Sequence, residues 1–407
     1  MFRSCWKLLL LLLAIASPAT AAPDEEALGK SQGYPIGTPR NWFYDERVRV
    51  GSFSHVDRIL PHNVLKRAAS PLPLLPPPPG EQLTSRLGRA TLVIRQFLAG
   101  QRITGLLIIK DGQILVEHYQ YDRTAAHRLV SHSMAKSIVS LGVGIAVHEG
   151  KIRSLDDTVA TYVRDLAGSA YGETSIRNLL RMASGVRFTE VYDGQDDLAT
   201  FSRLRSKDGT TAALRAFNSR EAAAGNRFKY ATSETVVLAA LLRAVTHTTL
   251  SDYLTSRLWQ PMGAEADATW IKTLDGLEVG GGSFNAVLRD YGRLGMLLAN
   301  DGAVGARQVI PKDYLLEATD WRRQPAAFAP RTATPYFGYG YQFWLYPGDK
   351  RRFALLGVYG QSIFVDPELK LVMVITAVAK NASVGKETLA VERDLLWREL
   401  VNGFGRW

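Results

Sequence analysis

Ser133 and Lys136 stand three residues apart at the start of a largely apolar stretch, residues 133–148. In a helix, residues at this spacing are neighbours on one surface. A serine hydroxyl becomes an effective nucleophile when a proton acceptor lies within hydrogen-bond reach. A lysine can accept that proton if burial lowers its pKa enough to leave it neutral. The pair could therefore perform nucleophilic catalysis; the alternative is a helix-capping serine followed by a lysine whose amine reaches solvent.

The element that would position this pair is a core helix. Apolar residues recur at intervals of three and four, which predicts one buried helical face over 133–148, at Met134, Ile138, Leu141 and Ile145. Two other Ser-x-x-Lys matches lack such a context, because Ser4 lies in an apparent leader and Ser383 in a polar stretch after a predicted strand. Only Ser133 opens an amphipathic helix.

Two further segments could complete a site. Tyr230 precedes Thr232 and Ser233, residue types that cap helices, so its phenol could point from a helix start into a cleft. A packed core tyrosine is the alternative. Residues 357–362 interrupt the predicted strands with glycines, which allow a substrate to approach the backbone closely. An ordinary bulge is the alternative there.

The first 21 residues predict a cleaved secretory signal, with Arg3 and Lys7 before the apolar run 8–16 and a small-residue cleavage site. We therefore expect a periplasmic or secreted protein. The run is too short to span about 30 Å of hydrocarbon, and no later stretch is long enough, so we expect no transmembrane span in the mature form. The single cysteine, Cys5, lies in this leader, which excludes disulfides and thiol chemistry in the mature chain.

The net charge of +10 comes from scattered Lys and Arg residues. This distribution favours a solvated basic surface and no nucleic-acid partner. Gly29–Gly33 matches a Gly-x-Ser-x-Gly elbow but lacks the buried strand before it. The histidines, including His132, never reach a metal-helix spacing. We read His132 as a neighbour of the site at most.

Periodicity predicts an α+β fold with a mainly antiparallel sheet, flanked by helices and carrying a helical insert. A hairpin is expected at 104–119 around Lys110-Asp111-Gly112, and helices at about 175–258 and 386–401. Further strands are expected at 339–344, 353–357, 362–365 and 371–378. The predicted organisation is an irregular extension with a proline-rich connector (22–80), a sheet domain (81–160 and 270–407) and a mainly helical domain (161–269).

The three candidate segments resemble the motifs of the penicillin-recognising serine hydrolases. This group holds class C β-lactamases, D-alanyl-D-alanine peptidases, and the esterases and 6-aminohexanoate-dimer hydrolases related to them. The resemblance rests on Ser133 with Lys136, on Tyr230 and on the glycine-bearing motif that ends at Gly360, in the family's order. Flanking sequence segments extend the resemblance from about residue 106 to the C-terminus; they are residues 155–159, 176–185, 281–284 and 360–362. It implies the β-lactamase/transpeptidase-like fold.

By this resemblance, Ser133 attacks a carbonyl, Lys136 takes its proton and Tyr230 passes a proton to the leaving group. Backbone N–H groups of Ser133 and Gln361 would form the oxyanion hole. The implied activity is hydrolysis of a small ester or amide through an acyl-serine, with no metal or cofactor.

One departure narrows the choice within the group. Penicillin-processing members begin the third motif with Lys or His, whereas this chain has Val358-Tyr359-Gly360. The missing cation weakens recognition of a carboxylate. The resemblance therefore favours the esterase and amidase branch, as does N-terminal text at 34–42 and 49–53. Tyr192, with Val358, Tyr359 and Gly360, is expected near the substrate. A D-alanyl-D-alanine peptidase or β-lactamase, and a catalytically silent envelope-binding protein, remain the alternatives.

Overall fold

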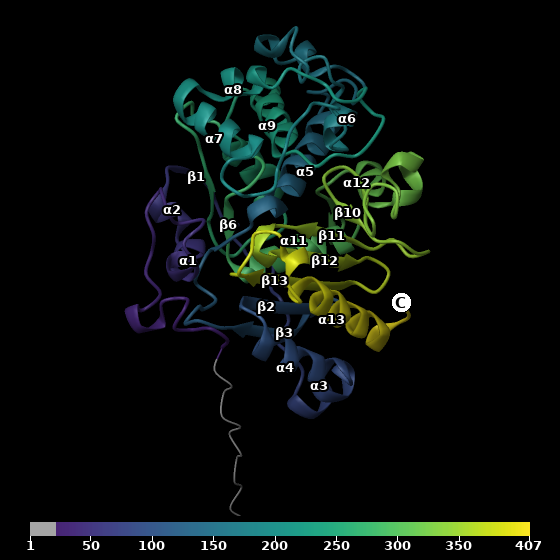
Figure 1. Ribbon diagram of the computed structural model, residues 1–407. Coiled ribbons are helices and arrows are strands. Elements are labelled where there is room, and N and C mark those ends of the chain that lie inside the picture. The colour runs from purple at the N-terminus through teal and green to yellow at the C-terminus, as the bar shows by residue number, and fades with distance from the viewer. Residues whose placement is uncertain (1–21) are drawn as a thin grey trace, which may run out of the picture.

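The computed structural model describes residues 22–407, so the predicted signal peptide and Cys5 lie outside the described residues. The largest sheet contains seven antiparallel strands in the order β3-β2-β13-β12-β11-β10-β9 (Figure 1). Their bounds are β2 Ile103–Lys110, β3 Gln113–Tyr119, β9 Gly338–Tyr339, β10 Trp344–Leu345, β11 Phe353–Leu356, β12 Ser362–Asp366 and β13 Leu371–Ala377. A mainly antiparallel α+β fold is confirmed.

The hairpin between β2 and β3 forms where the sequence predicts it. Lys110 pairs with Gln113, and the two turn residues Asp111 and Gly112 both have positive φ, at 51° and 77°. Two such residues give a turn whose twist matches that of the strands. The single strand expected at 339–344 is wrong: β9 and β10 are two short strands joined by a turn in which Gln342 has φ 65°.

Helices cover both faces of the seven-stranded sheet. Alternate side chains of β13 point to opposite faces, as the pleat requires: Val372 and Val374 join the core on the α11 side (Leu288–Ala299), while Met373 and Ile375 join the core under α13 (Leu389–Phe404). The second face also receives α3 (Gly80–Leu87) and α4 (Ala90–Gly100), which pack against α13 (Figure 1).

The helix expected at 133–148 is present but is buried on almost all sides, so the expectation of one buried face is wrong. A 3-10 turn, His132–Met134, precedes α5 (Ala135–His148), and only the last two residues of α5 are not buried. Its neighbours are α9 (Thr232–Thr246) and α12 (Lys312–Thr319). A helix that is apolar all round belongs in the centre of a protein, and Ser133 at its start is held by that rigid core.

Helices α6 (Ile176–Leu180), α7 (Asp197–Asp208) and α8 (Thr210–Ala216) lie above the sheet, at the top of Figure 1. Helix α10 (Leu250–Leu254) contacts α9. Asp196 caps α7 by accepting from the Ala199 N–H, and Ser175 caps α6 through Asn178. No helix of residues 22–407 has the length and apolar character needed to cross a membrane.

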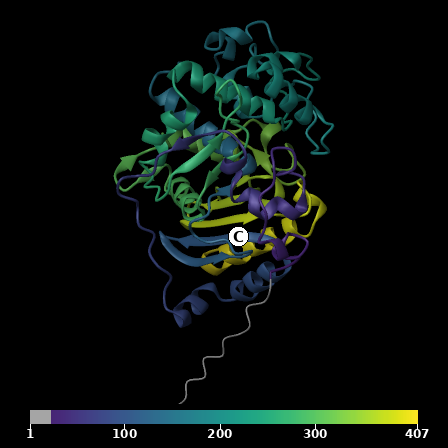
Figure 2. The ribbon, with the colours of Figure 1, turned by 90° about the vertical axis from the view of Figure 1, so that its left-hand side faces the viewer.

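The N-terminal extension is structured, contrary to the irregular region expected from sequence. It contains α1 (Glu46–Phe53), α2 (Val56–Ile59) and β1 (His62–Leu65). Strand β1 pairs with β5 (Ala268–Ile271), which continues through β6 (Phe284–Ala286) to β4 (Leu129–Val130). Figure 2 shows the extension, in purple, running along the side of the molecule. A further two-stranded ribbon joins Ala303–Val304 and Arg307–Gln308.

Candidate active site

Ser133 and Lys136 are brought together by the turn that leads into α5. Lys136 Nζ lies 2.9 Å from Ser133 Oγ, and it donates a 2.7 Å hydrogen bond to the carbonyl oxygen of Gly281. Gly281 belongs to the loop before β6, and a Cβ there would meet the Thr232 methyl at 2.5 Å. The loop therefore approaches both the lysine and the start of α9 closely because residue 281 has no side chain.

The Lys136 side chain is only 1% exposed, and the structure gives it no carboxylate within salt-bridge distance among residues 22–407. Burial lowers its pKa from 10.5 to about 8, and the charge of Glu190 opposes this shift weakly. Burial disfavours an ammonium ion because the charge loses its hydration. A substantial fraction of Lys136 is thus neutral near pH 8 and can accept a proton from Ser133.

Tyr230 comes from the segment just before α9 and faces the same pair. Lys136 Nζ lies 5.0 Å from the centre of the Tyr230 ring, which places the phenol beside the Ser133–Lys136 pair. The ring stacks on Trp344 at 5.6 Å, which fixes its orientation. Burial raises the pKa of the phenol above its usual value of 10, with a smaller opposing effect from Ser133. Tyr230 therefore stays protonated while Lys136 loses its proton.

Glu190 is a neighbour of this group that the sequence did not single out. Its carboxylate accepts hydrogen bonds from the Thr232 N–H and hydroxyl, both 2.7 Å, and from the Tyr192 hydroxyl at 2.6 Å. It thereby ties the loop after Ser184-Gly185 to the start of α9, close to Tyr230. In the sequence, only its position two residues before Tyr192 could have indicated that Glu190 belongs to the site. A single acidic residue in a loop is too common to predict a site residue.

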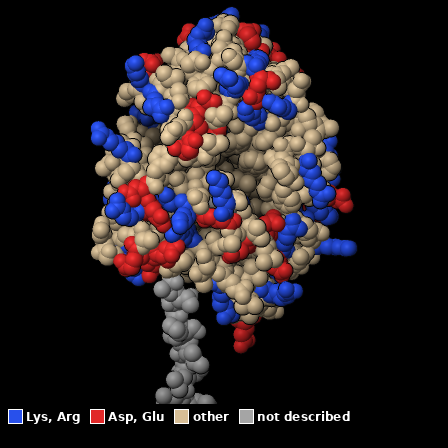
Figure 3. All heavy atoms as spheres, in the orientation of Figure 1, with Lys and Arg blue, Asp and Glu red and all other residues tan. Residues whose placement is uncertain are grey.

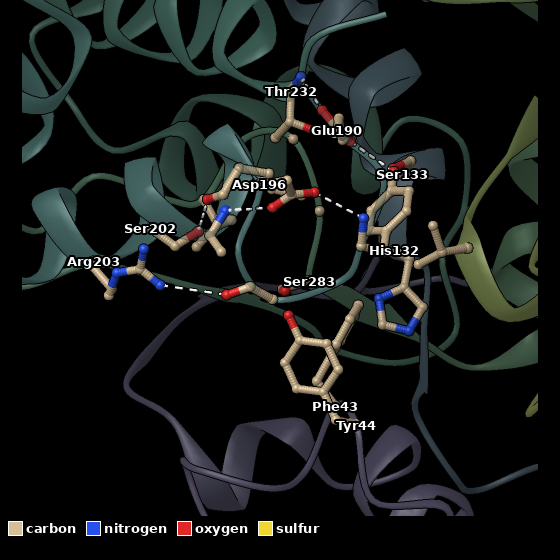
Figure 4. A pocket seen from close by; sticks show the side chains of 18 of the residues that line it. Phe43, Tyr44, His132, Ser133, Glu190, Asp196, Ser202, Arg203, Thr232 and Ser283 are labelled. Carbon is tan, nitrogen blue, oxygen red and sulfur yellow. Dashed lines mark hydrogen bonds between the residues drawn. The ribbon is translucent and has the colours of Figure 1, made fainter. Parts of the chain in front are cut away.

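A cavity of about 880 Å³ opens beside Ser133. Most of its lining comes from the extension at 39–44, the loop and α7 at 190–207, and the loop at 279–283; His132, Ser133, Thr232 and Val358 complete it. Figure 4 shows Ser133, Glu190 and Thr232 together on one side of this cavity, Arg203 on the other, and Phe43 and Tyr44 below. The aromatic wall contributed by Trp42, Phe43 and Tyr44 was not expected.

The predicted pocket residues divide into two groups. Tyr192 and Val358 line the cavity. Tyr359 and Gly360 do not: Tyr359 is 3% exposed and packs under His132 and Phe43, with Arg49 above its ring at 4.3 Å. Gly360 is buried against Leu389 and Ala377. A sharp turn, with φ of 60° at Tyr359 and 99° at Gly360, directs both residues away from the cavity.

The chain passes closest to the Ser133 backbone at Gly357, the residue after β11. A Cβ at Gly357 would lie 3.1 Å from the Ser133 nitrogen and 2.5 Å from the Ser131 oxygen, so only glycine fits. Gln361, expected at this place, is instead buried deeper, where its side-chain amide exchanges hydrogen bonds with the Ala377 N–H and carbonyl of β13. The residue that follows Gly357 and faces the cavity is Val358.

His132 lies directly before the nucleophile and is buried in an aromatic cluster with Trp42, Phe43, Phe53 and Tyr359. Burial, with Arg49 and Lys136 nearby, lowers its pKa to about 3, so the ring is neutral. Among residues 22–407, no group of three His, Cys, Asp or Glu side chains is arranged to hold a metal ion.

Comparison with known proteins identifies the family. The model of the family described as Beta-lactamase matches residues 91–394, well over half of the chain. The 6-aminohexanoate-dimer hydrolase of Paenarthrobacter ureafaciens is 25% identical over 332 residues, which cover 79% of this chain and 83% of the relative.

Solved structures share the fold. A protein of Bacillus anthracis described as a 6-aminohexanoate-dimer hydrolase gives a TM-score of 0.73 at 21% identity, over 88% of this chain and 95% of the other. The hydrolase EstCE1 gives 0.60 at 19% identity, over 78% and 100%. With a family match over most of its length and the same fold as these hydrolases, the chain belongs to the β-lactamase family of serine hydrolases.

Proposed function

We propose that this protein hydrolyses small esters or amides through an acyl intermediate on Ser133. The observation that carries the proposal is the position of Lys136, buried and 2.9 Å from the Ser133 oxygen, with a pKa lowered to about 8. A nucleophile beside a base that is neutral near the working pH is the arrangement that serine acylation requires. The similarity to a 6-aminohexanoate-dimer hydrolase supports the same branch of the family.

In the proposed reaction, Ser133 Oγ attacks the carbonyl carbon while Lys136 Nζ takes the hydroxyl proton. The tetrahedral intermediate then collapses, and the bond to the leaving group breaks as Tyr230 donates its proton to that group. The Lys136 ammonium returns a proton to Tyr230. Water next attacks the acyl-Ser133 ester through the same groups in reverse, which releases the acid and restores the serine.

The oxyanion would accept hydrogen bonds from the backbone N–H groups of Ser133 and Val358. Val358 takes the place expected for Gln361 because Gly357 packs against the Ser133 nitrogen and Val358 lines the cavity, whereas Gln361 is not among the lining residues. Each such donor contributes a few kcal/mol, about 3, to stabilising the transition state in comparable enzymes.

The segment beside Ser133 also supports the esterase or amidase branch over a D-alanyl-D-alanine peptidase or β-lactamase. From Phe353 through Gln361 the sequence has no Lys, Arg or His. A D-alanyl-D-alanine peptidase or β-lactamase would have to bind the carboxylate of its substrate at this segment. The segment offers no charged side chain that could donate a hydrogen bond to that carboxylate.

Labelling tests the proposal directly. Incubation of the purified protein with a fluorophosphonate, followed by peptide mass spectrometry, is expected to place the label on Ser133. Ser383, in the other described Ser-x-x-Lys match, serves as the internal control and should stay unmodified. Folded protein without label on Ser133 would remove the proposal and favour a catalytically silent binding protein. Stoichiometric acylation of Ser133 by benzylpenicillin would favour the peptidase or β-lactamase alternative.

The pH dependence of kcat/KM should follow Lys136. Because the neutral amine is the active form and its pKa is about 8, activity should rise about tenfold per pH unit below 8 and level off above it. Tyr230 must keep its proton, and burial raises its pKa, so no decline is expected before about pH 10. Stopped-flow hydrolysis of p-nitrophenyl acetate between pH 5 and 10 would measure the profile; a flat profile would rule out Lys136 as the base.

We also propose that the protein acts outside the cytoplasm, on the basis of the signal-like residues 1–21. N-terminal sequencing of protein from a bacterial periplasm is expected to begin at Ala22.

The positive and negative side chains on the face of the molecule shown in Figure 3 are interspersed. Such a surface suits a small-molecule substrate better than a polyanion.

A further inference from the structure

The cavity beside Ser133 holds two carboxylates whose hydrogen-bonding capacity is largely used. Asp196 accepts from the N–H groups of Val191, Tyr192 and Ala199 at 2.7, 2.8 and 2.9 Å. Glu190 accepts from Thr232 twice and from Tyr192 once. A carboxylate has about four acceptor positions, so both groups are occupied in holding the loop and the helix starts together. Neither is well placed to bind a cationic substrate group.

The two cations of the cavity differ in this respect. Arg203 and Lys207 are four residues apart on α7, so they share one face of the helix, and both are exposed at the cavity. Arg203 donates only to the Thr200 hydroxyl at 2.9 Å and to the Gly194 carbonyl at 3.5 Å. Among residues 22–407, neither side chain has a carboxylate within salt-bridge distance. Both cations are therefore free of a direct carboxylate partner and can contact an anionic group in the cavity.

Apolar side chains also line the cavity. They include Leu198 and Ala199 at the start of α7 and Trp42 and Phe43 from the extension. In Figure 4, Arg203 and Ser133 lie on opposite sides of the view, with Asp196 and Ser283 between them. A substrate that reaches from Ser133 to α7 would therefore place apolar atoms against these side chains and a second polar group beside Arg203.

We propose that the substrate of this enzyme carries an anionic group, such as a carboxylate, which Arg203 and Lys207 bind while the scissile carbonyl lies at Ser133. The inference rests on the proposed hydrolase function and adds a substrate class to it: esters or amides in which an apolar chain or ring separates the reacting carbonyl from a negative charge. Two cations without direct carboxylate partners lower the energy of such an anion relative to its neutral analogue. Both cations are solvated, so the effect should weaken as ionic strength rises.

Matched substrates test the proposal. The first pair is mono-p-nitrophenyl adipate and p-nitrophenyl hexanoate, which place the charge or its neutral counterpart on the acyl side. The second pair is the hexanoyl ester of 4-hydroxybenzoate and that of its methyl ester, which do so on the leaving group. Each kcat/KM is compared between the wild type and Arg203→Gln/Lys207→Gln, so that the intrinsic reactivity of each ester cancels.

The double variant should lose about five- to tenfold in kcat/KM on the charged member of at least one pair, since each exposed ion pair contributes modestly. It should stay within about twofold on the neutral members, because Ser133, Lys136 and Tyr230 are untouched. Lys151→Gln/Arg307→Gln removes the same charge from exposed positions away from the cavity and should change neither ratio. Arg203→Lys should keep the preference, which separates charge from support of the Gly194 loop.

Equal losses on charged and neutral members, or no loss on the charged member of either pair, would overturn the proposal. So would a charge preference that does not decline with added salt. A wild-type enzyme that hydrolyses none of the four esters would instead contradict the proposed function itself. The two failures are therefore distinguishable within one set of measurements.

Discussion

Replacing Lys136 with methionine is expected to reduce kcat/KM for ester hydrolysis by about 10³-fold, because the change removes the group that takes the Ser133 proton. The fold should survive. Methionine is close to lysine in length, and burying an amine without a counter-charge costs free energy that a thioether does not. We therefore expect the melting temperature of the variant to equal or exceed that of the wild type, measured by circular dichroism.

Lys136→Arg provides the sharper form of this experiment. Arginine keeps a positive charge near Ser133, but its pKa above 12 prevents it from acting as a base. If Lys136 acts by proton transfer, this variant should be as inactive as the methionine variant. Retention of a tenth or more of the activity would instead assign Lys136 an electrostatic role. Lys151→Met, at an exposed position after α5, is the matched control and should be fully active.

Tyr230→Phe is expected to show a loss that depends on the leaving group. For an amide such as a p-nitroanilide, whose nitrogen must be protonated to depart, kcat/KM should fall about 10²-fold or more. For p-nitrophenyl acetate, whose leaving group departs as an anion, the loss should be at least tenfold smaller. The structure supports this assignment because burial keeps the phenol protonated beside a partly neutral Lys136.

Tyr339→Phe is the control for this experiment. Tyr339 is 1% exposed and contacts the Tyr230 ring edge-on at 6.3 Å. Its loss of a hydroxyl should leave both substrates unaffected. Equal losses on the anilide and the ester in Tyr230→Phe would show that the phenol orients Ser133 and does not protonate the leaving group.

The parts of the fold that the sequence predicted best are those governed by local rules. The β2–β3 hairpin follows from Asp111-Gly112, whose backbone must adopt positive φ, and the strands at 353–378 follow from apolar runs around Asp366-Pro367. In contrast, α5 looked amphipathic because Ser137, Ser140 and two glycines interrupt its apolar pattern. In the structure Ser137 and Ser140 are buried, where they bond to the Gln342 carbonyl and to Tyr314. Periodicity cannot reveal such partners, which lie far away in the chain.

The sequence predicted the part of the site that local geometry determines, and not the part that depends on the packing of distant segments. Ser133 and Lys136 lie within one helical turn, so local geometry brings them together once the helix forms. The contributions of Gly357, Glu190 and Trp42 depend on how separate loops pack. The motif Val358-Tyr359-Gly360 includes one residue that lines the cavity, Val358, but a pattern of glycines does not show that Gly357, and not Gly360, meets Ser133. The steric test at Gly357, where a Cβ would lie 2.5 Å from a carbonyl oxygen, does show it.

Because the N-terminal extension is structured and lines the cavity, it belongs to the functional unit of this protein. The model of the family matches residues 91–394, yet Trp42, Phe43 and Tyr44 form one wall of the cavity. Arg49 fastens this segment to the core by donating to the Ala379 carbonyl at 2.7 Å, and β1 supplies an edge strand to the smaller sheet. A gene fragment trimmed to residues 91–394 would therefore encode Ser133, Lys136 and Tyr230 without the aromatic wall of the cavity that contacts the substrate. Recombination or library design that exchanges residues 34–65 between relatives has, for the same reason, a route to new substrate ranges that leaves Ser133, Lys136 and Tyr230 in place.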